Sequence, residues 1–300
     1  MKGFVNLYKP IGMSSSHAVG KVKRALQTAT GEKQKVGHFG TLDPLACGVL
    51  PIAIGNATRL FDLSQEKVKV YQATFKFGIE TDTLDGEGQI TAQNDKVIDE
   101  QAVLNALSAF RGRIAQVPPA YSAKSVGGKR AYELAREGKS VDLRAKEVEI
   151  FDFKLIPSTG GKVILRDGEH TLDTNEFAFE IACSSGTYIR SLARDLASAL
   201  GTVGYMSSLL RVQSGVFSLD DAVTLEEFEK NPLGYVLSIG FALGKYAEFE
   251  IPQECEKQVI NGVAVHFDNL PQGVFQVKLS GEVVGIAKNE DNKLRFIVRL

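Results

Sequence analysis

Apolar residues recur three and four positions apart in residues 15–26, 99–112 and 187–201. This spacing places them on one face of an α-helix, so each segment is predicted to be a helix that buries that face. The inward face of the last helix is expected to comprise Ile189, Leu192, Ala193, Leu196 and Leu200. The expected ends are Ser15 or Ser16 as the N-cap of the first helix, Asp99 and Gly112 as the limits of the second, and Gly201 after the third.

Strand patterns are interspersed with these helices. Residues 69–78 alternate apolar and polar positions, which is the period of a half-buried strand, and residues 146–156 and 176–183 also have strand patterns. The order of helices and strands is not a regular β-α-β repeat, and no glycine-rich phosphate loop is present, which argues against a doubly wound fold. The predicted fold class is α+β, with a mixed, mainly antiparallel sheet and helices packed against it.

The pattern changes near residues 229–235 and again near 250–254. Beyond this point short strand patterns are joined by Gly and Asn/Asp turns. We therefore predict a catalytic domain over residues 1–245 and a small β-rich domain over residues 246–300.

Composition limits the class of protein. The 300 residues correspond to about two average domains. The chain has only three cysteines, with no CxxC pair, so neither a disulfide framework nor a zinc finger is predicted. No segment approaches the ~20 apolar residues of a membrane span, and the first residues lack a signal-peptide core, so a cytoplasmic protein without membrane contact is expected.

The net charge of −1 conceals two basic segments. Residues 1–40 carry seven Lys and Arg against one Glu, and residues 111–146 carry nine against three acidic residues, so each segment has a net charge of +6. The acidic residues that balance this positive charge include those within residues 219–229. A single basic segment is commonly a solvated face, but two segments that flank one candidate site weaken that explanation.

The candidate site is the stretch "GHFGTLDPLACGVLPIAIG", residues 37–55. Asp43 precedes a proline and must therefore be extended, at a turn or a strand end. An isolated Asp-Pro is usually an Asx turn. Here, glycines allow a ligand to approach closely, and the apolar run 48–55 is predicted to be a buried strand that excludes water behind the carboxylate. Such a carboxylate can act as a nucleophile or a base.

Other chemistries fit these residues less well. His38, Asp43 and Cys47 match no common zinc spacing, so no metal is expected. The serines before His17 are better explained as a helix cap than as part of a catalytic triad. A glycosidase needs two facing carboxylates, for which Asp82 and Asp85 are the nearest candidates. A single carboxylate instead suits cleavage at an anomeric carbon when the leaving group is a base that stays bound.

The stretch "GHFGTLDPLACGVLPIAIGNATRL" resembles the central motif of the TruB family of pseudouridine synthases. The resemblance continues in residues 7–15, in "KVYQATFKFGIETDTLDGEG", in residues 116–138 and in "CSSGTYIRSLARDLASALG", and so spans nearly the whole chain. It implies a pseudouridine synthase fold with a C-terminal PUA-like RNA-binding domain. Residues 116–146 resemble the RNA-binding insertion of the standalone bacterial enzyme, which uses no guide RNA.

By this resemblance the substrate is tRNA, bound through its T-arm, and the target is the T-loop uridine at tRNA position 55. The family's catalytic aspartate falls on Asp43, its active-site tyrosine on Tyr71, and the arginine that pairs with the aspartate on Arg190. The isomerisation is redox-neutral and needs no cofactor. The residues leave open whether Asp43 attacks C1′ or removes a sugar proton. The family also implies a monomer.

The resemblance further implies a set of substrate-binding residues. His38 is expected to hold the reorganised loop, Lys9 to support Tyr71, and Leu209 to contact the base, while the basic segments contact phosphates. The full set is His38, Lys9, Pro10, Tyr188, Leu209, Lys129 and Arg130. Phe39 departs from the family pattern, in which this residue is commonly small or Thr. Two rival functions remain open at this stage, an RNA-binding module without chemistry and a base-removing glycosylase.

Overall fold

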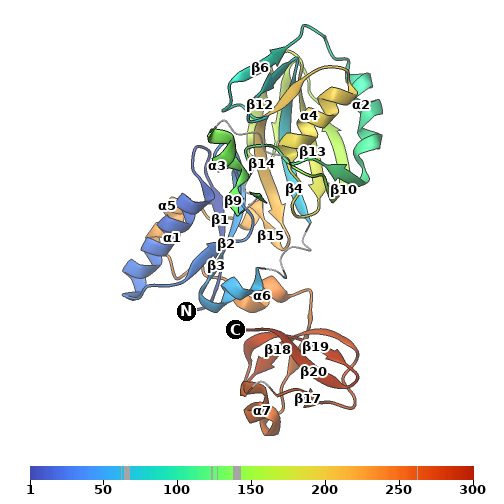
Figure 1. The fold of residues 1–300 in the computed structure, drawn as a ribbon. Coiled ribbons are helices and arrows are strands. Elements are labelled where there is room, and N and C mark those ends of the chain that lie inside the picture. Colours follow the sequence, from blue (N-terminus) through green and yellow to red (C-terminus); the bar gives the residue numbers. More distant parts are fainter. Residues whose placement is uncertain (62, 64–67, 123, 127, 138–142, 262) are drawn as a thin grey trace.

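A nine-stranded sheet forms the main body of the computed structural model, which describes residues 1–61, 63, 68–122, 124–126, 128–137, 143–261 and 263–300. The strand order is β1-β3-β14-β4-β13-β10-β7, with β2 paired to β3 and β15 to β14 (Figure 1). These strands are β1 (Gly3–Lys9), β2 (Val36–His38), β3 (Cys47–Ile54), β4 (Lys69–Phe77), β7 (Gly112–Gln116), β10 (Lys146–Ile156), β13 (Glu176–Cys183), β14 (Gly204–Ser214) and β15 (Phe217–Ser218). Among the described strands of this sheet, β3 and β14 pair in parallel and the other pairs are antiparallel. The predicted α+β class with a mainly antiparallel sheet is confirmed.

Four helices share one hydrophobic core with this sheet. Helices α1 (Ser15–Thr30) and α5 (Leu225–Lys230) pack beside β1 and β2, whereas α2 (Glu100–Leu107) and α4 (Ile189–Ala199) pack on β10, β4 and β14 (Figure 1). The smaller elements of this part are the hairpins β5 (Ile79–Thr81) with β6 (Ile90–Gln93), β8 (Ser125–Val126) with β9 (Lys129–Arg130), and β11 (Lys162–Leu165) with β12 (Gly168–Thr171), and the helices α3 (Ala131–Arg136) and α6 (Ile239–Leu243).

Two helix ends differ from the sequence predictions. Ser14, rather than Ser15 or Ser16, caps α1, because its side chain accepts a hydrogen bond from the N–H of His17. Helix α2 ends at Leu107 instead of continuing to Gly112. A short 3₁₀ turn follows, and Gly112, with a φ of 83°, then turns the chain into β7.

Strand β4 is buried on both faces, although its sequence predicts a half-buried strand. Gln72 and Thr74, on the polar face, are 7% and 4% exposed. Gln72 accepts a hydrogen bond from the N–H of Arg166 at 2.7 Å, and Arg166 lies in the turn of the β11–β12 hairpin. This hairpin therefore covers the second face of the strand, and the polar side chains there are satisfied by hydrogen bonds rather than by water.

A second sheet of five strands forms the C-terminal part, in the order β16-β18-β19-β20-β17 (Figure 1). Its elements are β16 (Ala247–Glu250), α7 (Glu256–Ile260), β17 (Val265–His266), β18 (Gly273–Leu279), β19 (Glu282–Glu290) and β20 (Lys293–Arg299). It has a hydrophobic cluster of its own, while Ile286 joins a cluster with Phe4 and the apolar residues of α6. In the described part of the chain, none of the helices combines the length and apolar character needed to span a bilayer.

Candidate active site

The loop between β2 and β3 carries Asp43 and is fixed by contacts with the segment that follows β1. The hydroxyl of Ser15 accepts a hydrogen bond from the N–H of Leu42 at 2.8 Å and donates one to the carbonyl of the same residue at 2.9 Å. The N–H of Gly12 donates to the carbonyl of Pro44 at 2.8 Å. The main chain is therefore held on both sides of Asp43, which limits the positions that its carboxylate can take.

Gly48 allows β3 to meet β14 directly behind this loop. A Cβ atom at Gly48 would lie 2.3 Å from the carbonyl oxygen of Arg211 and 2.9 Å from its nitrogen, and the φ of Gly48 is +101°. Both observations require glycine at this position. The contact places Arg211, which is fully buried, beneath the loop.

The guanidinium of Arg211 ties the loop to the sheet. Its Nε donates to the carbonyl of Val49 at 2.7 Å, and its Nη2 donates to the carbonyl of Gly40 at 3.0 Å. The carbonyl of Thr41 lies at 3.5 Å from Nη1. Sequence analysis did not identify this residue; the only signal was a single arginine within the apolar run of residues 209–212.

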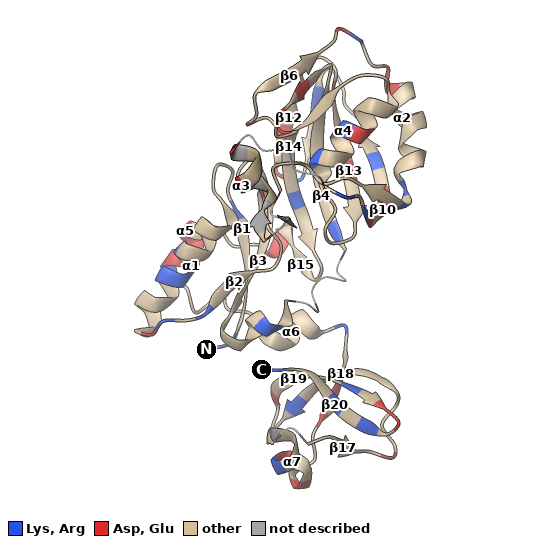
Figure 2. Ribbon diagram, viewed as in Figure 1, with Lys and Arg blue, Asp and Glu red and all other residues tan. Residues whose placement is uncertain are grey.

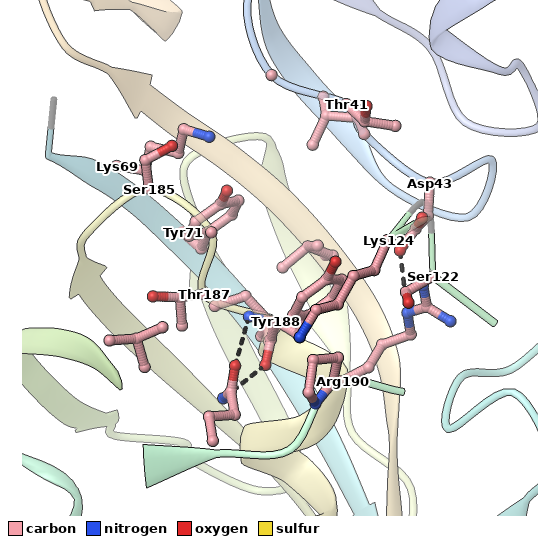
Figure 3. Close-up of a pocket in the computed structure, with 18 of the residues that line it drawn as sticks. Thr41, Asp43, Lys69, Tyr71, Ser122, Lys124, Ser185, Thr187, Tyr188 and Arg190 are labelled. Carbon is pink, nitrogen blue, oxygen red and sulfur yellow. Dashed lines mark hydrogen bonds and ion pairs between the residues drawn. The ribbon is translucent and has the colours of Figure 1, made fainter. Parts of the chain in front are cut away.

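Asp43 and Arg190 form an ion pair, with 3.0 Å between Oδ2 and Nε (Figure 3). The arginine is in the first turn of α4 and its side chain is 7% exposed, whereas that of Asp43 is 35% exposed. Nη1 and Nη2 of Arg190 also donate to the carbonyls of Thr83 and Tyr121, each at 2.9 Å. Because every nitrogen of the guanidinium is engaged, Arg190 holds the carboxylate in one position.

Asp85 lies against the same guanidinium, 3.4 Å from Nη1. Its Oδ1 accepts hydrogen bonds from the hydroxyl of Thr83 at 2.6 Å and the N–H of Glu87 at 3.1 Å. Asp85 is buried and does not line the cavity into which Asp43 faces, and Asp82 is exposed. Neither of the two predicted carboxylates is therefore placed across the cavity from Asp43, as a glycosidase would require.

A cavity of about 500 Å³ opens beside the ion pair. Four of the predicted site residues line it together with Asp43, namely Tyr71, Tyr188, Arg190 and Leu209. Gln116 binds the main chain of Tyr188 through both ends of its amide, at 2.8 and 3.1 Å, and so fixes the entry into α4. Residues far apart in the sequence thus meet where β4, β14 and α4 surround the loop that carries Asp43 (Figure 3).

Tyr71 is 6% exposed and lies on β4. Burial raises the pKa of its phenol to about 12, and the guanidinium of Arg211 opposes this rise. The side chain is therefore a neutral phenol near pH 7, which offers a ring face and one hydrogen-bond donor to a ligand in the cavity.

Three of the predicted binding residues, Lys9, Pro10 and His38, do not line the cavity. The ammonium of Lys9 is buried and donates to the carbonyls of Pro10 at 2.9 Å and Met13 at 2.6 Å, and burial lowers its pKa to about 8. His38 lies on β2, its Nδ1 is buried without a hydrogen-bond partner, and burial lowers the pKa of its ring. Through its hydrogen bonds to Pro10 and Met13, Lys9 supports the turn that holds the loop of Asp43.

Basic residues of segment 1–40 lie on several elements, including β1 and α1 (Figure 2). Besides Lys9, Lys2 donates to the carbonyl of Val283 at 3.1 Å, and Lys21 lies 3.7 Å from Glu229. The tertiary structure gives each of these three residues a partner within the protein, and Lys9 lies beside the loop of Asp43. That the segment as a whole flanks the site stays a prediction.

The second basic segment contributes directly to the cavity wall. Lys124 and Lys146 line it, as does Lys69 from β4. With Arg190, these residues make four cationic side chains against the single carboxylate of Asp43 among the lining residues. The main chain of Lys129 and Arg130 lies in β9, but their side chains are not described, and residues 123, 127 and 138–142 of the predicted insertion lie outside the described residues.

No group of three or more His, Cys, Asp or Glu side chains arranged to hold a metal ion occurs in the described part of the chain. The serines considered for a triad have other partners, since Ser14 caps α1 and Ser15 binds Leu42. The remaining chemistry at the cavity is that of one fixed carboxylate, a neutral phenol and an excess of positive charge.

Comparison with known proteins assigns this arrangement to a family. The N-terminal domain model of the TruB family of pseudouridylate synthases matches residues 23–189, and the model of the tRNA pseudouridylate synthase B C-terminal domain matches residues 190–235. The chain belongs to the TruB family. The predicted enzyme class, a pseudouridine synthase, is confirmed.

Curated TruB relatives match over most of their length. A tRNA pseudouridine synthase B from Clostridium novyi is 41% identical over 88% of this chain and 86% of the relative. One from Clostridium kluyveri is 33% identical over 99% of both chains, and one from Acaryochloris marina is 46% identical over 75% of this chain and 73% of the relative.

Solved structures share the TruB fold at lower identity. A chain of an H/ACA RNP bound to a substrate RNA containing 2′-deoxyuridine matches with a TM-score of 0.69 and 20% identity, over 99% of this chain and 84% of that chain. A chain of a Cbf5-Nop10-Gar1 complex matches with a TM-score of 0.68 and 23% identity over the same shares. At these identities the likeness shows the fold, which includes the C-terminal sheet.

Proposed function

We propose that this chain isomerises the T-loop uridine at position 55 of tRNA to pseudouridine, with Asp43 as the catalytic carboxylate. The observation that carries the proposal is the ion pair of Asp43 and Arg190 at a cavity lined by Tyr71. The TruB relatives named tRNA pseudouridine synthase B support tRNA uridine as the substrate.

The reaction breaks the bond between C1′ and N1, rotates the uracil, and forms a bond between C1′ and C5. The hydrogen on C5 is released as a proton and N1 gains one, so no oxidant or reductant is consumed. In one route the carboxylate attacks C1′, and in the other it removes a proton from the sugar. Both routes need an ionised carboxylate beside the ribose, and both keep the detached uracil in the site.

The residues around the cavity suit these requirements. Arg190 fixes the carboxylate of Asp43 and offsets its charge. The neutral phenol of Tyr71 presents a ring on which uracil can stack and a hydroxyl that can donate a hydrogen bond. Leu209 is buried and supplies an apolar wall. Such walls exclude water while the base is detached.

A uridine in a folded loop must leave its stack before it can enter this cavity, at a cost of a few kcal/mol. Contacts with the RNA backbone can offset that cost. We assign these contacts to Lys124, Lys146, Lys129 and Arg130, with residues 116–146 lying over the T-arm. His38, Lys9, Pro10 and Tyr188 are proposed to support the substrate around this site.

We further propose that residues 246–300 form a PUA-like domain that binds RNA, with residues 1–245 as the catalytic domain. Lys and Arg on β19 and β20 give this sheet cationic positions (Figure 2). The enzyme is proposed to act as a cytoplasmic monomer without a guide RNA.

Tritium release tests the reaction. Wild-type protein is incubated with tRNA that carries C5-tritiated uridine, beside Asp43→Asn and the control Asp95→Asn, which alters an exposed loop carboxylate. Wild type and the control are expected to release tritium without releasing uracil, while Asp43→Asn releases none. Free uracil would instead indicate a glycosylase, and binding without tritium release would indicate an RNA-binding module.

The target position needs a separate measurement. Pseudouridine in the product is mapped by its specific chemical modification and primer extension, using tRNA with uridine or cytidine at position 55. The proposal expects a single new stop at position 55 that disappears with cytidine. A stop elsewhere would overturn the T-loop assignment while leaving the isomerase chemistry intact.

A further inference from the structure

Lys69 is a half-buried cation in the cavity wall. It is the first residue of β4, where its main chain pairs with Cys183 of β13 and Ser214 of β14. Strands on both sides therefore fix its position. Its ammonium makes no hydrogen bond or ion pair with any residue that the structure describes, unlike Lys9 and Arg190.

The surroundings of Lys69 are also positively charged. A Cβ atom placed on Gly40 would lie 2.9 Å from Nζ of Lys69 and 3.4 Å from Nη1 of Arg211. The two cationic groups thus lie on the same side of Gly40. Burial, and after it the charge of Arg211, lower the pKa of Lys69 to about 8, while Cys183 opposes the change. His38, whose pKa is lowered by burial and by these same two cations, adds no negative charge.

The neighbouring groups cannot supply a counterion. Asp43, the only carboxylate among the lining residues, is held by Arg190. The guanidinium of Arg211 is committed to the carbonyls of Gly40 and Val49, so of these two neighbouring cations it is Lys69 that stays available. In the view of Figure 3, Lys69 lies on one side of Tyr71 and the pair of Asp43 and Arg190 on the other.

A partly buried ammonium without a counterion is unfavourable, and a fold that keeps one commonly uses it for a ligand. An RNA strand that delivers a nucleotide into this cavity brings a phosphodiester on each side of that nucleotide. A phosphate supplies the missing negative charge and accepts up to three hydrogen bonds from an ammonium.

We propose that Lys69 binds a backbone phosphate directly next to the uridine that enters the cavity. The inference rests on the proposed function, because it needs RNA as the substrate. The phosphate supplies the counterion that the cation lacks in the free protein, so the contact favours binding. This contribution is gained only when the nucleotide enters the cavity. Lys69 is then a substrate-positioning residue on the opposite side of Tyr71 from the carboxylate.

Replacing Lys69 with methionine keeps the length of the side chain and removes its charge. The dissociation constant for a T-arm hairpin is measured over a series of KCl concentrations for wild type, Lys69→Met and the control Lys154→Met, which alters an exposed lysine on β10. Lys69→Met is expected to weaken binding about tenfold and to reduce the slope of log K against log salt by about 0.7–0.9, the value of one phosphate contact. The control should keep the wild-type slope.

Hairpins with one neutral methylphosphonate linkage locate the phosphate. The linkage is placed on the 5′ or the 3′ side of the target uridine. One of the two is expected to weaken wild type about tenfold and to have no effect on Lys69→Met, because the partner charge is already missing. An unchanged salt slope, or equal effects of each linkage on both proteins, would overturn the inference and point to a contact with the base instead.

Tritium release by wild type on the unmodified hairpin separates this inference from the proposed function. If wild type releases tritium and Lys69→Met keeps the wild-type salt slope, only the role of Lys69 is wrong. If wild type neither binds the hairpin nor releases tritium, the proposed substrate itself is wrong. Retained thermal unfolding of Lys69→Met shows that a loss of binding does not come from a loss of folding.

Discussion

The guanidinium of Arg211 donates a hydrogen bond from Nη2 to the carbonyl of Gly40, three residues before Asp43. The same group donates to the carbonyl of Val49, behind the loop. Arg211→Met is expected to leave these buried carbonyls without donors, at about 1–3 kcal/mol each, partly offset because a guanidinium no longer has to be desolvated. We expect a net destabilisation of roughly 2–4 kcal/mol and a loss of activity, measured by urea unfolding and tritium release. Wild-type activity in a destabilised variant would show that the loop does not depend on this clamp.

Ser14 and Ser15 are adjacent serines whose hydroxyls bind different groups, so alanine substitutions at the two positions can be compared directly. Ser15→Ala removes both hydrogen bonds to Leu42 and is expected to cost about 1–3 kcal/mol and to lower kcat, since Leu42 precedes Asp43. Ser14→Ala removes only the cap of α1, at about 1 kcal/mol, and should keep the wild-type kcat. Steady-state kinetics and urea unfolding measure the two effects. Equal kcat values in the two variants would contradict the positioning role of Ser15.

Arg190→Lys keeps the positive charge of Arg190 but loses the fork of nitrogens. A single ammonium cannot reach Asp43, Asp85 and the carbonyl of Thr83 together, so we expect kcat to fall about 10²–10³-fold while the affinity for RNA changes little. Arg194→Lys, one turn further along α4, is the control and should retain activity. A kcat near the wild-type value in Arg190→Lys would show that charge alone suffices.

The pH dependence of stability should report the burial of Lys69. Its pKa is lowered from 10.5 in the unfolded chain to about 8 in the folded protein, so the folded state binds fewer protons between these values. Stability from this group therefore rises as the pH increases from about 8 to 10.5, and below pH 8 the charged side chain destabilises the fold. Lys69→Met is expected to be more stable than wild type at pH 7, and the difference should shrink across that window. Urea unfolding at several pH values measures the difference in unfolding free energy between the two proteins. Lys9 has a similarly lowered pKa, but both proteins contain it, so its contribution cancels in this difference.

The sequence predicted the elements of the main sheet better than their environment. The bounds of β10 and β13 coincide with the predicted strands, because their patterns are continuous and end at polar or glycine-rich turns. The burial of the polar face of β4 was not predicted, since it depends on the hairpin of residues 162–171, which packs against it from a distant part of the chain. Local periodicity carries no information about such a cover.

The candidate site was located from its motif, but its supports were not. Tyr71, Arg190 and Leu209 do line one cavity with Asp43, as the family resemblance implied. From periodicity alone Arg190 would be an exposed helix residue, and Arg211 carried no motif at all. Both are arginines whose burial is possible only because acceptors from other elements surround them.

The sequence by itself determined the α+β class, several strands of the main sheet and the carboxylate on which the proposed chemistry depends. These follow from spacing and from a local motif, which act over a few neighbouring residues. Only the tertiary structure decided which cations have a partner within the protein and which do not. A charge acquires its partner, or lacks one, through contacts between segments that the sequence places as many as 280 positions apart, as with Lys2 and Glu282.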